Sequence, residues 1–258
     1  MIQVSPLEFF VVGEIFAFLL IFARLGAAIM VMPGFAEIYV SPRVRLLLAL
    51  MFSLALTPVL QPYLPEIPGS PVTLTILLVG ETLVGVFFGV MVRFLLSATH
   101  TAGSIISYQS SLAIATQFDP GQGGQTTIVS NFIGLAALVF VFTMDLHHVM
   151  LKGIVESYGL FVPGQFPVVG DMANLLSETL TKMFLVATQM ATPHIVFAML
   201  FYLGSGVLAR LMPNMQVFFV IMPIHITISM IILMAVLPTM LLTLYDFAYE
   251  TLIGFLNP

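Results

Sequence analysis

The sequence predicts an all-α integral membrane protein, and its composition and hydropathy pattern support this fold class. Hydrophobic residues make up 60% of the 258 residues, charged residues make up 7%, and the mean hydropathy is +1.12. Such a chain has too little polar surface to cover a water-soluble globule, whereas lipid tails tolerate apolar side chains that face outward. About six of its apolar stretches are long enough for helices that cross a bilayer.

The expected membrane spans follow one another along the whole chain. They are Phe9–Met32, Leu46–Leu64, Val72–Ser97, Ile128–Leu151, Met183–Gly206 and Val217–Tyr245. Prolines cluster between the first three spans, as expected where helices must end. The longest polar connection, from Lys152 to Lys182, is too short and too poor in apolar residues to bury a core of its own. We therefore expect no water-soluble domain.

Composition and motifs exclude several classes of function. The absence of cysteine excludes disulfides, thiolate metal sites and thiol nucleophiles. The formal net charge is -5, and no basic run is present that would attract nucleic acid. No Ser-His-Asp set, paired carboxylate motif or HExxH motif is visible, so we expect neither an enzyme nor a cofactor.

One segment, from Ser104 to Gln125, does not fit a span. It reads SIISYQSSLAIATQFDPGQGGQ, which is rich in small and polar side chains and ends in Gly and Pro. It is too polar to face lipid, and irregular backbone at membrane depth needs protein or water around it because unsatisfied peptide groups are costly in hydrocarbon. One interpretation is a re-entrant element that lines or blocks a cavity. A plain extramembrane loop with a short amphipathic helix explains the composition about equally well.

Ionisable residues within the apolar spans need a partner or a route to water, because a charge near the bilayer centre costs roughly 2.5 to 3.5 kcal/mol. Glu14 is too far along its own helix to pair with Arg24, and Arg93 is too far from Glu81. Partners of these groups are therefore expected on other helices or other subunits, although Glu14 and Arg93 lie close enough to span ends to reach water. We assign such inter-helix or inter-subunit contacts to Arg24, Glu81, Arg93 and Arg210.

Three further patterns have an ordinary structural explanation. Asp145, His147 and His148 lie at the end of the fourth span, but the remaining histidines are scattered over other segments, so we expect no metal site. The spacing Gly85-x-x-x-Gly89 allows close helix approach, although such spacing often arises by chance. The 17 methionines could close around a variable cargo, but methionine more often fills gaps between helices.

Several short motifs are together specific in their order and spacing. They are Pro42-Arg43-Val44-Arg45, Thr101-Ala102-Gly103, Phe118-Asp119-Pro120-Gly121, the pair His147-His148, Ala209-Arg210-Leu211-Met212-Pro213 and Val217-Phe218-Phe219-Val220-Ile221-Met222-Pro223. With these motifs, nearly the whole chain resembles the FliR and SctT family of type III secretion export-gate subunits. It departs from the family at Asp145-Leu146, where members often have Asn-Gly, and at Met222, where they often have Gly.

The resemblance implies an architecture and partners. A P-subunit-like helical part would cover residues 1–177, and a Q-subunit-like helical hairpin would cover residues 178–258. The implied partners are P-type, Q-type and B-type export-gate subunits (FliP, FliQ and FlhB-like), unfolded export substrates and membrane lipid, with no nucleic acid. The implied location is the bacterial inner membrane, at the flagellar basal body.

The resemblance also implies that the segment matching Ser107 to Gly124 is a plug inside a closed pore. The plug residues it assigns are Ser107, Tyr108, Gln109, Leu112, Ile114, Phe118, Asp119, Gly121 and Gly123. The function implied is a structural subunit that supplies pore wall and plug for translocation of unfolded substrates and changes no bond. A small polytopic secondary transporter remains the alternative, although it would need an inverted repeat that the sequence does not display. Asp119-Pro120 and the overall pattern favour the flagellar export gate, although the sequence does not separate a flagellar from a virulence system with certainty.

Overall fold

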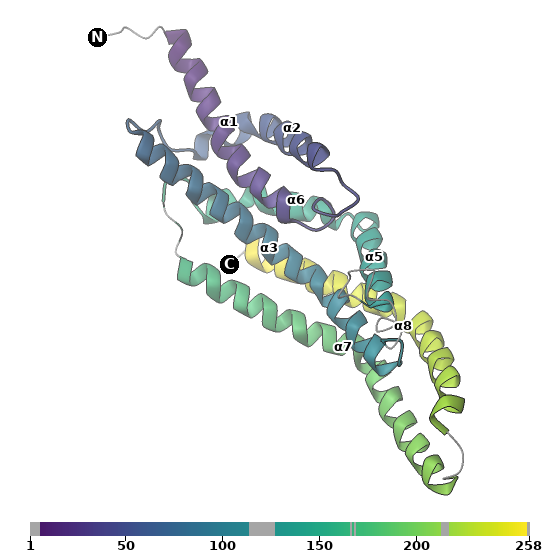
Figure 1. Ribbon diagram of the computed structural model, residues 1–258. Helices are drawn as coiled ribbons and strands as arrows, with labels where there is room; N and C mark the ends of the chain where they lie inside the picture. The colour runs from purple at the N-terminus through teal and green to yellow at the C-terminus, as the bar shows by residue number, and fades with distance from the viewer. Residues whose placement is uncertain (1–5, 114–126, 166, 168, 213–216, 257–258) are drawn as a thin grey trace. The chain divides into compact units, whose positions relative to one another are not determined.

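All regular elements of the protein are helices within residues 6–113, 127–165, 167, 169–212 and 217–256, which a computed structural model describes (Figure 1). Side chains are described for residues 12–113, 127–165, 167, 169–212 and 220–255. The elements are α1 (Pro6–Val31), α2 (Pro42–Leu60), the 3-10 helix η1 (Gln61–Tyr63), α3 (Pro71–Gln109), α5 (Ile128–Thr143), α6 (Leu146–Leu160), α7 (Val169–Leu211) and α8 (Val217–Leu256). The predicted all-α membrane fold is confirmed.

The helices have the length and composition of membrane spans. Among the described residues, 5 helices are long and apolar enough to cross a membrane, or up to 6 if the bent pair of α5 and α6 counts as one span. Three of them are much longer than the sequence predicts. Helices α3, α7 and α8 have 39, 43 and 40 residues. At about 1.5 Å per residue each extends for roughly 60 Å, about twice the thickness of bilayer hydrocarbon.

The predicted end of the third span, at Ser97, is wrong. Helix α3 continues to Gln109 and includes the first residues of the polar segment, from Ser104 onward. Within this stretch Ser107 is buried, and its hydroxyl is hydrogen-bonded inside the protein. Hydropathy alone cannot detect a helix whose polar side chains are satisfied by other parts of the same chain.

The prediction of one continuous fourth span, Ile128–Leu151, is also wrong. The chain bends by 73° between α5 and α6. Asp145 lies at this break with a left-handed backbone, at φ 57°. Its short polar side chain tolerates that conformation better than most residues. The supposed polar connection from Lys152 to Lys182 is largely helical, because α6 continues to Leu160 and α7 begins at Val169.

The start of α2 accounts for the Pro42-Arg43-Val44-Arg45 motif. Ser41 caps the helix by accepting a hydrogen bond from the backbone nitrogen of Val44, and Pro42 occupies the first turn, where its missing N–H costs nothing. The Arg45 guanidinium donates to the backbone oxygens of Glu37 and Val40. The motif thus sets where the helix begins and holds the preceding loop against it.

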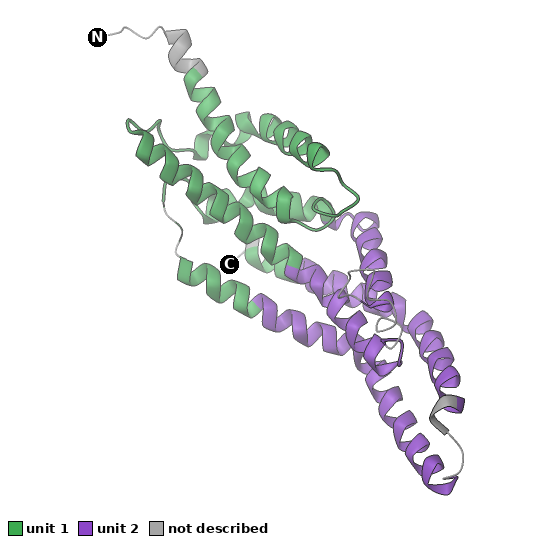
Figure 2. Cartoon of the chain, viewed as in Figure 1, with its two compact units in different colours: residues 1–93, 147–178, 251–258 green, residues 94–146, 179–250 purple. Residues whose placement is uncertain are grey.

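The chain divides into two compact units that do not follow its order (Figure 2). Unit 1 comprises residues 1–93, 147–178 and 251–258, and unit 2 comprises residues 94–146 and 179–250. Helices α3, α7 and α8 each contribute to both. The predicted division into a P-subunit-like part (1–177) and a Q-subunit-like hairpin (178–258) is a division along the sequence, whereas the two units are defined by packing. The predicted division stays a prediction.

Unit 1 is built on a close approach of α1 and α3. A Cβ atom on Gly85 would lie 2.1 Å from the backbone oxygen of Arg24, and one on Gly89 would lie 2.9 Å from that of Ala28. The Gly-x-x-x-Gly spacing therefore lets the two backbones touch. Apolar side chains fill the space around this contact. Two clusters hold Ile21, Leu60 and Tyr158, and Val84, Phe87 and Met172.

Unit 2 has a second close approach, between the end of α3 and α5. A Cβ on Gly103 would lie 2.4 Å from Cα of Ser130. On Gly134 it would lie 2.4 Å from Cε1 of His100. The Thr101-Ala102-Gly103 motif thus supplies the small residue that this crossing requires. Within the same unit, α7 and α8 are linked by His194, whose Nε2 lies 3.3 Å from the backbone oxygen of Ser229.

Candidate functional site: a buried ion pair and a polar turn

Arg24 on α1 and Glu81 on α3 form a buried ion pair inside unit 1. Their side chains are 1% and 4% exposed, and Nε of Arg24 lies 2.7 Å from Oε2 of Glu81. A second contact, from Nη2 to Oε1, measures 3.2 Å, so the pair is bidentate. The sequence left the partners of these residues open between other helices and other subunits. The structure pairs them with each other, within one chain.

Two further donors of Arg24 are also used. Nη2 donates to the backbone oxygen of Phe161 at 2.8 Å, and Nη1 donates to Oγ of Ser157 at 3.3 Å. The ring of Tyr158 lies over the guanidinium, with its centroid 3.9 Å from Cζ. Four of the five guanidinium N–H donors thus have partners within the chain, which leaves at most one for a ligand. This cluster is a fixed link between α1, α3 and α6 and not a binding site.

The other predicted ionic contacts lie nearer to the surface. Glu14 accepts a hydrogen bond from Nε2 of Gln61 at 2.9 Å, across α1 and the start of η1. Arg93 and Arg210 are both exposed. Their assignment to contacts between helices or subunits stays a prediction.

A polar turn, Ser107 to Ala113, ends α3 inside unit 2. The hydroxyl of Ser107 donates to Oγ1 of Thr127 at 2.7 Å. Thr127 also caps α5, because the same oxygen accepts from the backbone nitrogen of Ser130 at 3.2 Å. The backbone of Ala113 returns to the oxygen of Ser107 at 3.1 Å. The turn is therefore hydrogen-bonded both internally and to the first residues of α5.

Ser111 connects this polar turn to α7 and α8. Its hydroxyl lies 3.3 Å from the hydroxyl of Tyr202 and 3.4 Å from Nδ1 of His225. Its φ of 62° is left-handed, which is uncommon for serine. The His225 ring stacks on Phe201, with centroids 4.3 Å apart, and on Phe197, at 5.4 Å. All five residues belong to unit 2.

The structure places only part of the predicted plug. Ser107 is buried, Tyr108 is 70% exposed, and Gln109 and Leu112 are half-buried. The plug assignments at Ile114, Phe118, Asp119, Gly121 and Gly123 lie outside the described residues. The sequence pattern did not mark Thr127, Tyr202 or His225 as members of this site. Thr127 carried one usable signal, since a threonine directly before an apolar run is a typical helix cap.

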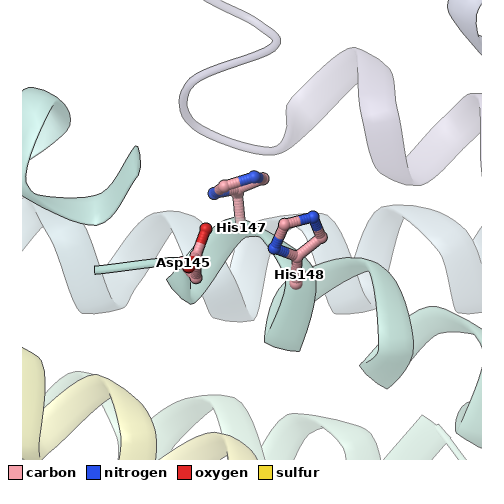
Figure 3. Close-up of side chains that lie close together, drawn as sticks. All are labelled: Asp145, His147 and His148. Atoms are coloured by element: carbon pink, nitrogen blue, oxygen red, sulfur yellow. The ribbon is translucent and has the colours of Figure 1, made fainter. Parts of the chain in front are cut away.

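Asp145, His147 and His148 gather at the break that leads into α6 (Figure 3). One ligand atom from each lies within 4.8 Å of the others, and the two imidazole centroids are 4.1 Å apart. Asp145 and His148 are exposed, and all three residues come from one short stretch of chain. Exposed groups of this kind are common without a bound ion, so proximity by itself does not establish a metal site.

These features define an all-α polytopic membrane protein whose polar groups join helices to one another. Residues 15–250 match the family of bacterial export proteins, family 1. The chain belongs to this family, as its resemblance to export-gate subunits predicted.

Named relatives agree with the family. The flagellar biosynthetic protein FliR of Caulobacter vibrioides is 34% identical over 220 residues, which cover 85% of this chain and 88% of that protein. FliR of Bacillus subtilis is 30% identical over 243 residues, covering 92% and 93%. The Yop proteins translocation protein T of Yersinia pestis is 25% identical over 171 residues, covering 66% of each chain.

The protein is therefore a membrane component of a bacterial flagellar or type III export apparatus. Its family supplies structural parts of that apparatus, which work in a complex with other subunits. This assignment leaves the alternative of a small secondary transporter without support.

Proposed function

We propose that this chain contributes wall and plug to the protein export gate of the bacterial flagellum, where unfolded substrates cross the inner membrane. The observation that carries the proposal is the polar turn. Ser107, Ser110 and Thr127 are buried and hydrogen-bonded in a chain whose helices are otherwise strongly apolar. Polar backbone and hydroxyl groups at membrane depth need protein or water around them, and a pore lumen supplies both.

Long apolar helices support assembly with companion subunits. Most side chains in the apolar stretch of α7 are not buried, and Leu200 and Leu203 are 65% and 67% exposed. A helix about 65 Å long cannot bury all of its apolar surface in roughly 30 Å of hydrocarbon, so other protein must cover part of it. We assign this cover to P-type, Q-type and B-type gate subunits (FliP, FliQ and FlhB-like), with α7 and α8 acting as the Q-like hairpin of residues 178–258.

A plug of this kind must seal and yet be displaced. An open, hydrated channel would dissipate the ion gradient across the membrane. Contacts such as the hydroxyl bond from Ser107 to Thr127 contribute about 1 kcal/mol each, so several together hold a segment that a driven substrate can still displace. The glycines at 121, 123 and 124 in the predicted plug suit movement. The plug residues are those assigned above, from Ser107 to Gly123.

The test uses the complete gate purified in mild detergent. Native mass measurement should find this chain in a stoichiometric complex with its companion subunits. Deleting Tyr108 to Phe118 should leave the assembly intact and raise the ionic conductance of membranes that contain it. Replacing the same residues with a Gly/Ser segment of equal length serves as the matched control for chain length, and should also conduct. A deletion complex as tight as the wild type would refute the plug.

A further inference from the structure

The side chains around Ser111 in unit 2 show how the polar turn is held. Three polar atoms lie in sequence: the hydroxyl of Tyr202, the hydroxyl of Ser111 and Nδ1 of His225, at 3.3 and 3.4 Å. They come from α7, the polar turn and α8. In the sequence, His225 was only one of the histidines scattered over several segments.

The backbone at Ser111 gives a second, independent observation. Its φ of 62° lies in the left-handed region, which asparagine, aspartate or glycine adopts more readily than serine. Such a conformation persists only where the surroundings fix it, and residues of this kind concentrate at functional positions. Here the hydroxyl contacts with Tyr202 and His225 are available only to a residue that has a side chain. Glycine would relieve the backbone and lose both contacts.

His225 is held firmly but is incompletely hydrogen-bonded. Its ring stacks on Phe201 and on Phe197 and is 1% exposed. Among the described residues, Nε2 of His225 has no hydrogen-bond partner. In either neutral tautomer, one ring nitrogen faces Ser111 and the other keeps a buried proton or lone pair unsatisfied. An unsatisfied buried group offsets part of what the other contacts contribute.

We propose that Ser111, Tyr202 and His225 form a releasable anchor that positions the polar turn on the α7–α8 hairpin. The stacked ring sets the place of Nδ1, and the two hydroxyl contacts, which are long for O–H···O and O–H···N bonds, hold the turn weakly. The buried, unsatisfied Nε2 of His225 offsets part of the free energy that these contacts contribute, so the turn is held weakly enough to be released. The use of the anchor rests on the proposed plug function, since the turn it holds begins the plug.

The test measures release of the turn directly. Leu112→Cys places a thiol probe in the turn. The labelled fraction of this chain is measured by mass spectrometry, and the chain contains no other cysteine that could react. The complete complex is labelled with a small water-soluble maleimide. Tyr202→Phe and His225→Phe each keep an aromatic ring and remove one hydrogen-bonding partner. We expect each to speed labelling about two- to tenfold, the effect of losing one hydrogen bond. The double variant should gain less than the product, because both partners act through one hydroxyl.

Two controls separate the anchor from general loosening. Tyr249→Phe removes a hydroxyl from α8 on a tyrosine of similar exposure, 39% against 44% for Tyr202, and should leave the rate unchanged. A probe at Met212→Cys, at the end of α7, should react at the same rate in every variant. Unchanged labelling at Leu112→Cys in both anchor variants, or an equal rise at Met212→Cys, would overturn the anchor.

Conductance of the same complexes distinguishes the anchor from the plug. If deletion of Tyr108 to Phe118 conducts while the anchor variants label at the wild-type rate, the plug stands and the anchor is wrong. If the anchor variants label faster but neither they nor the deletion conduct, the anchor stands and the plug is wrong. Faster labelling together with raised conductance supports both.

Discussion

The two units of the protein solve the same problem, polar groups inside an apolar bundle, in opposite ways. Unit 1 buries a full ion pair, Arg24 with Glu81, and two further guanidinium donors bond to Ser157 and to the backbone of Phe161. Unit 2 buries the hydroxyl groups of Ser107 and Thr127 and the imidazole of His225, and its contacts around the half-buried Ser111 are fewer and longer. Removing one member of a buried ion pair leaves an uncompensated charge, whereas removing one hydroxyl leaves a small defect.

This difference fits the wall and plug roles proposed for the two units. A charge held by several partners inside low-dielectric surroundings resists any rearrangement, which suits a wall. Neutral groups with weak bonds can exchange partners at little cost, which suits a segment that moves. Substitutions in the ion pair of unit 1 should therefore cost more stability than substitutions of the hydroxyl groups in unit 2.

The largest effect should follow Arg24→Ala. Glu81 would remain buried without its counter-charge, and we expect the free energy of unfolding to fall by about 3 to 5 kcal/mol. Unfolding of the purified complex in detergent measures this loss, and weaker co-purification of companion subunits should accompany it. The double variant Arg24→Ala with Glu81→Ala is the control, since removing both charges should cost less than the sum of the single changes. A loss below about 1 kcal/mol for Arg24→Ala would mean that water reaches the pair.

Gly85→Ala should have the next largest effect. The added Cβ would meet the backbone oxygen of Arg24 at 2.1 Å, so α1 and α3 must separate. We expect a loss of about 1 to 3 kcal/mol in thermal unfolding. Gly80→Ala on the same helix is the matched control, because nothing lies within 4 Å of its Cβ position. That change should be neutral or slightly stabilising through helix propensity. Equal effects would show that the helices do not touch at Gly85.

A smaller effect is expected for Ser107→Ala in unit 2. It removes the 2.7 Å bond to Thr127 without leaving a charge, so we expect a loss of about 1 kcal/mol. Ser104→Ala, one turn earlier on α3, removes only a bond to the backbone oxygen of His100 and should change stability by less. Hydrogen exchange of the α5 N-terminus measures both variants. A loss for Ser107→Ala as large as for Arg24→Ala would contradict the contrast between the units.

The smallest effect is expected for Lys152→Ala on α6. Its 3.2 Å pair with Glu156 is on the surface, with the lysine side chain 71% exposed. Exposed pairs at this helical spacing contribute about 0.3 to 0.5 kcal/mol. Thermal unfolding at low and high salt should be nearly identical for the variant and the wild type. A clear loss would indicate that α6 is covered by another subunit in the complex.

Sequence predicts much of the fold and part of the candidate site. Composition and long apolar stretches establish the membrane class and the helices, because lipid imposes a strong and local constraint on every side chain. The unusual polarity of Ser104 to Gln125 marks the region that becomes the polar turn. Helix ends are harder to predict from sequence. A span length based on bilayer thickness predicts that the third helix ends at Ser97, whereas α3 continues to Gln109, where its hydroxyl groups are hydrogen-bonded.

The sequence alone therefore indicates that the protein lies in a lipid bilayer, that it is helical and which family it belongs to. The tertiary structure alone decided that Arg24 pairs with Glu81, 57 residues away. It alone brought Ser111, Tyr202 and His225 together from three segments. The physical reason is that burial in lipid acts on each residue separately and can be read along the chain, whereas a buried polar contact depends on which distant backbones approach each other.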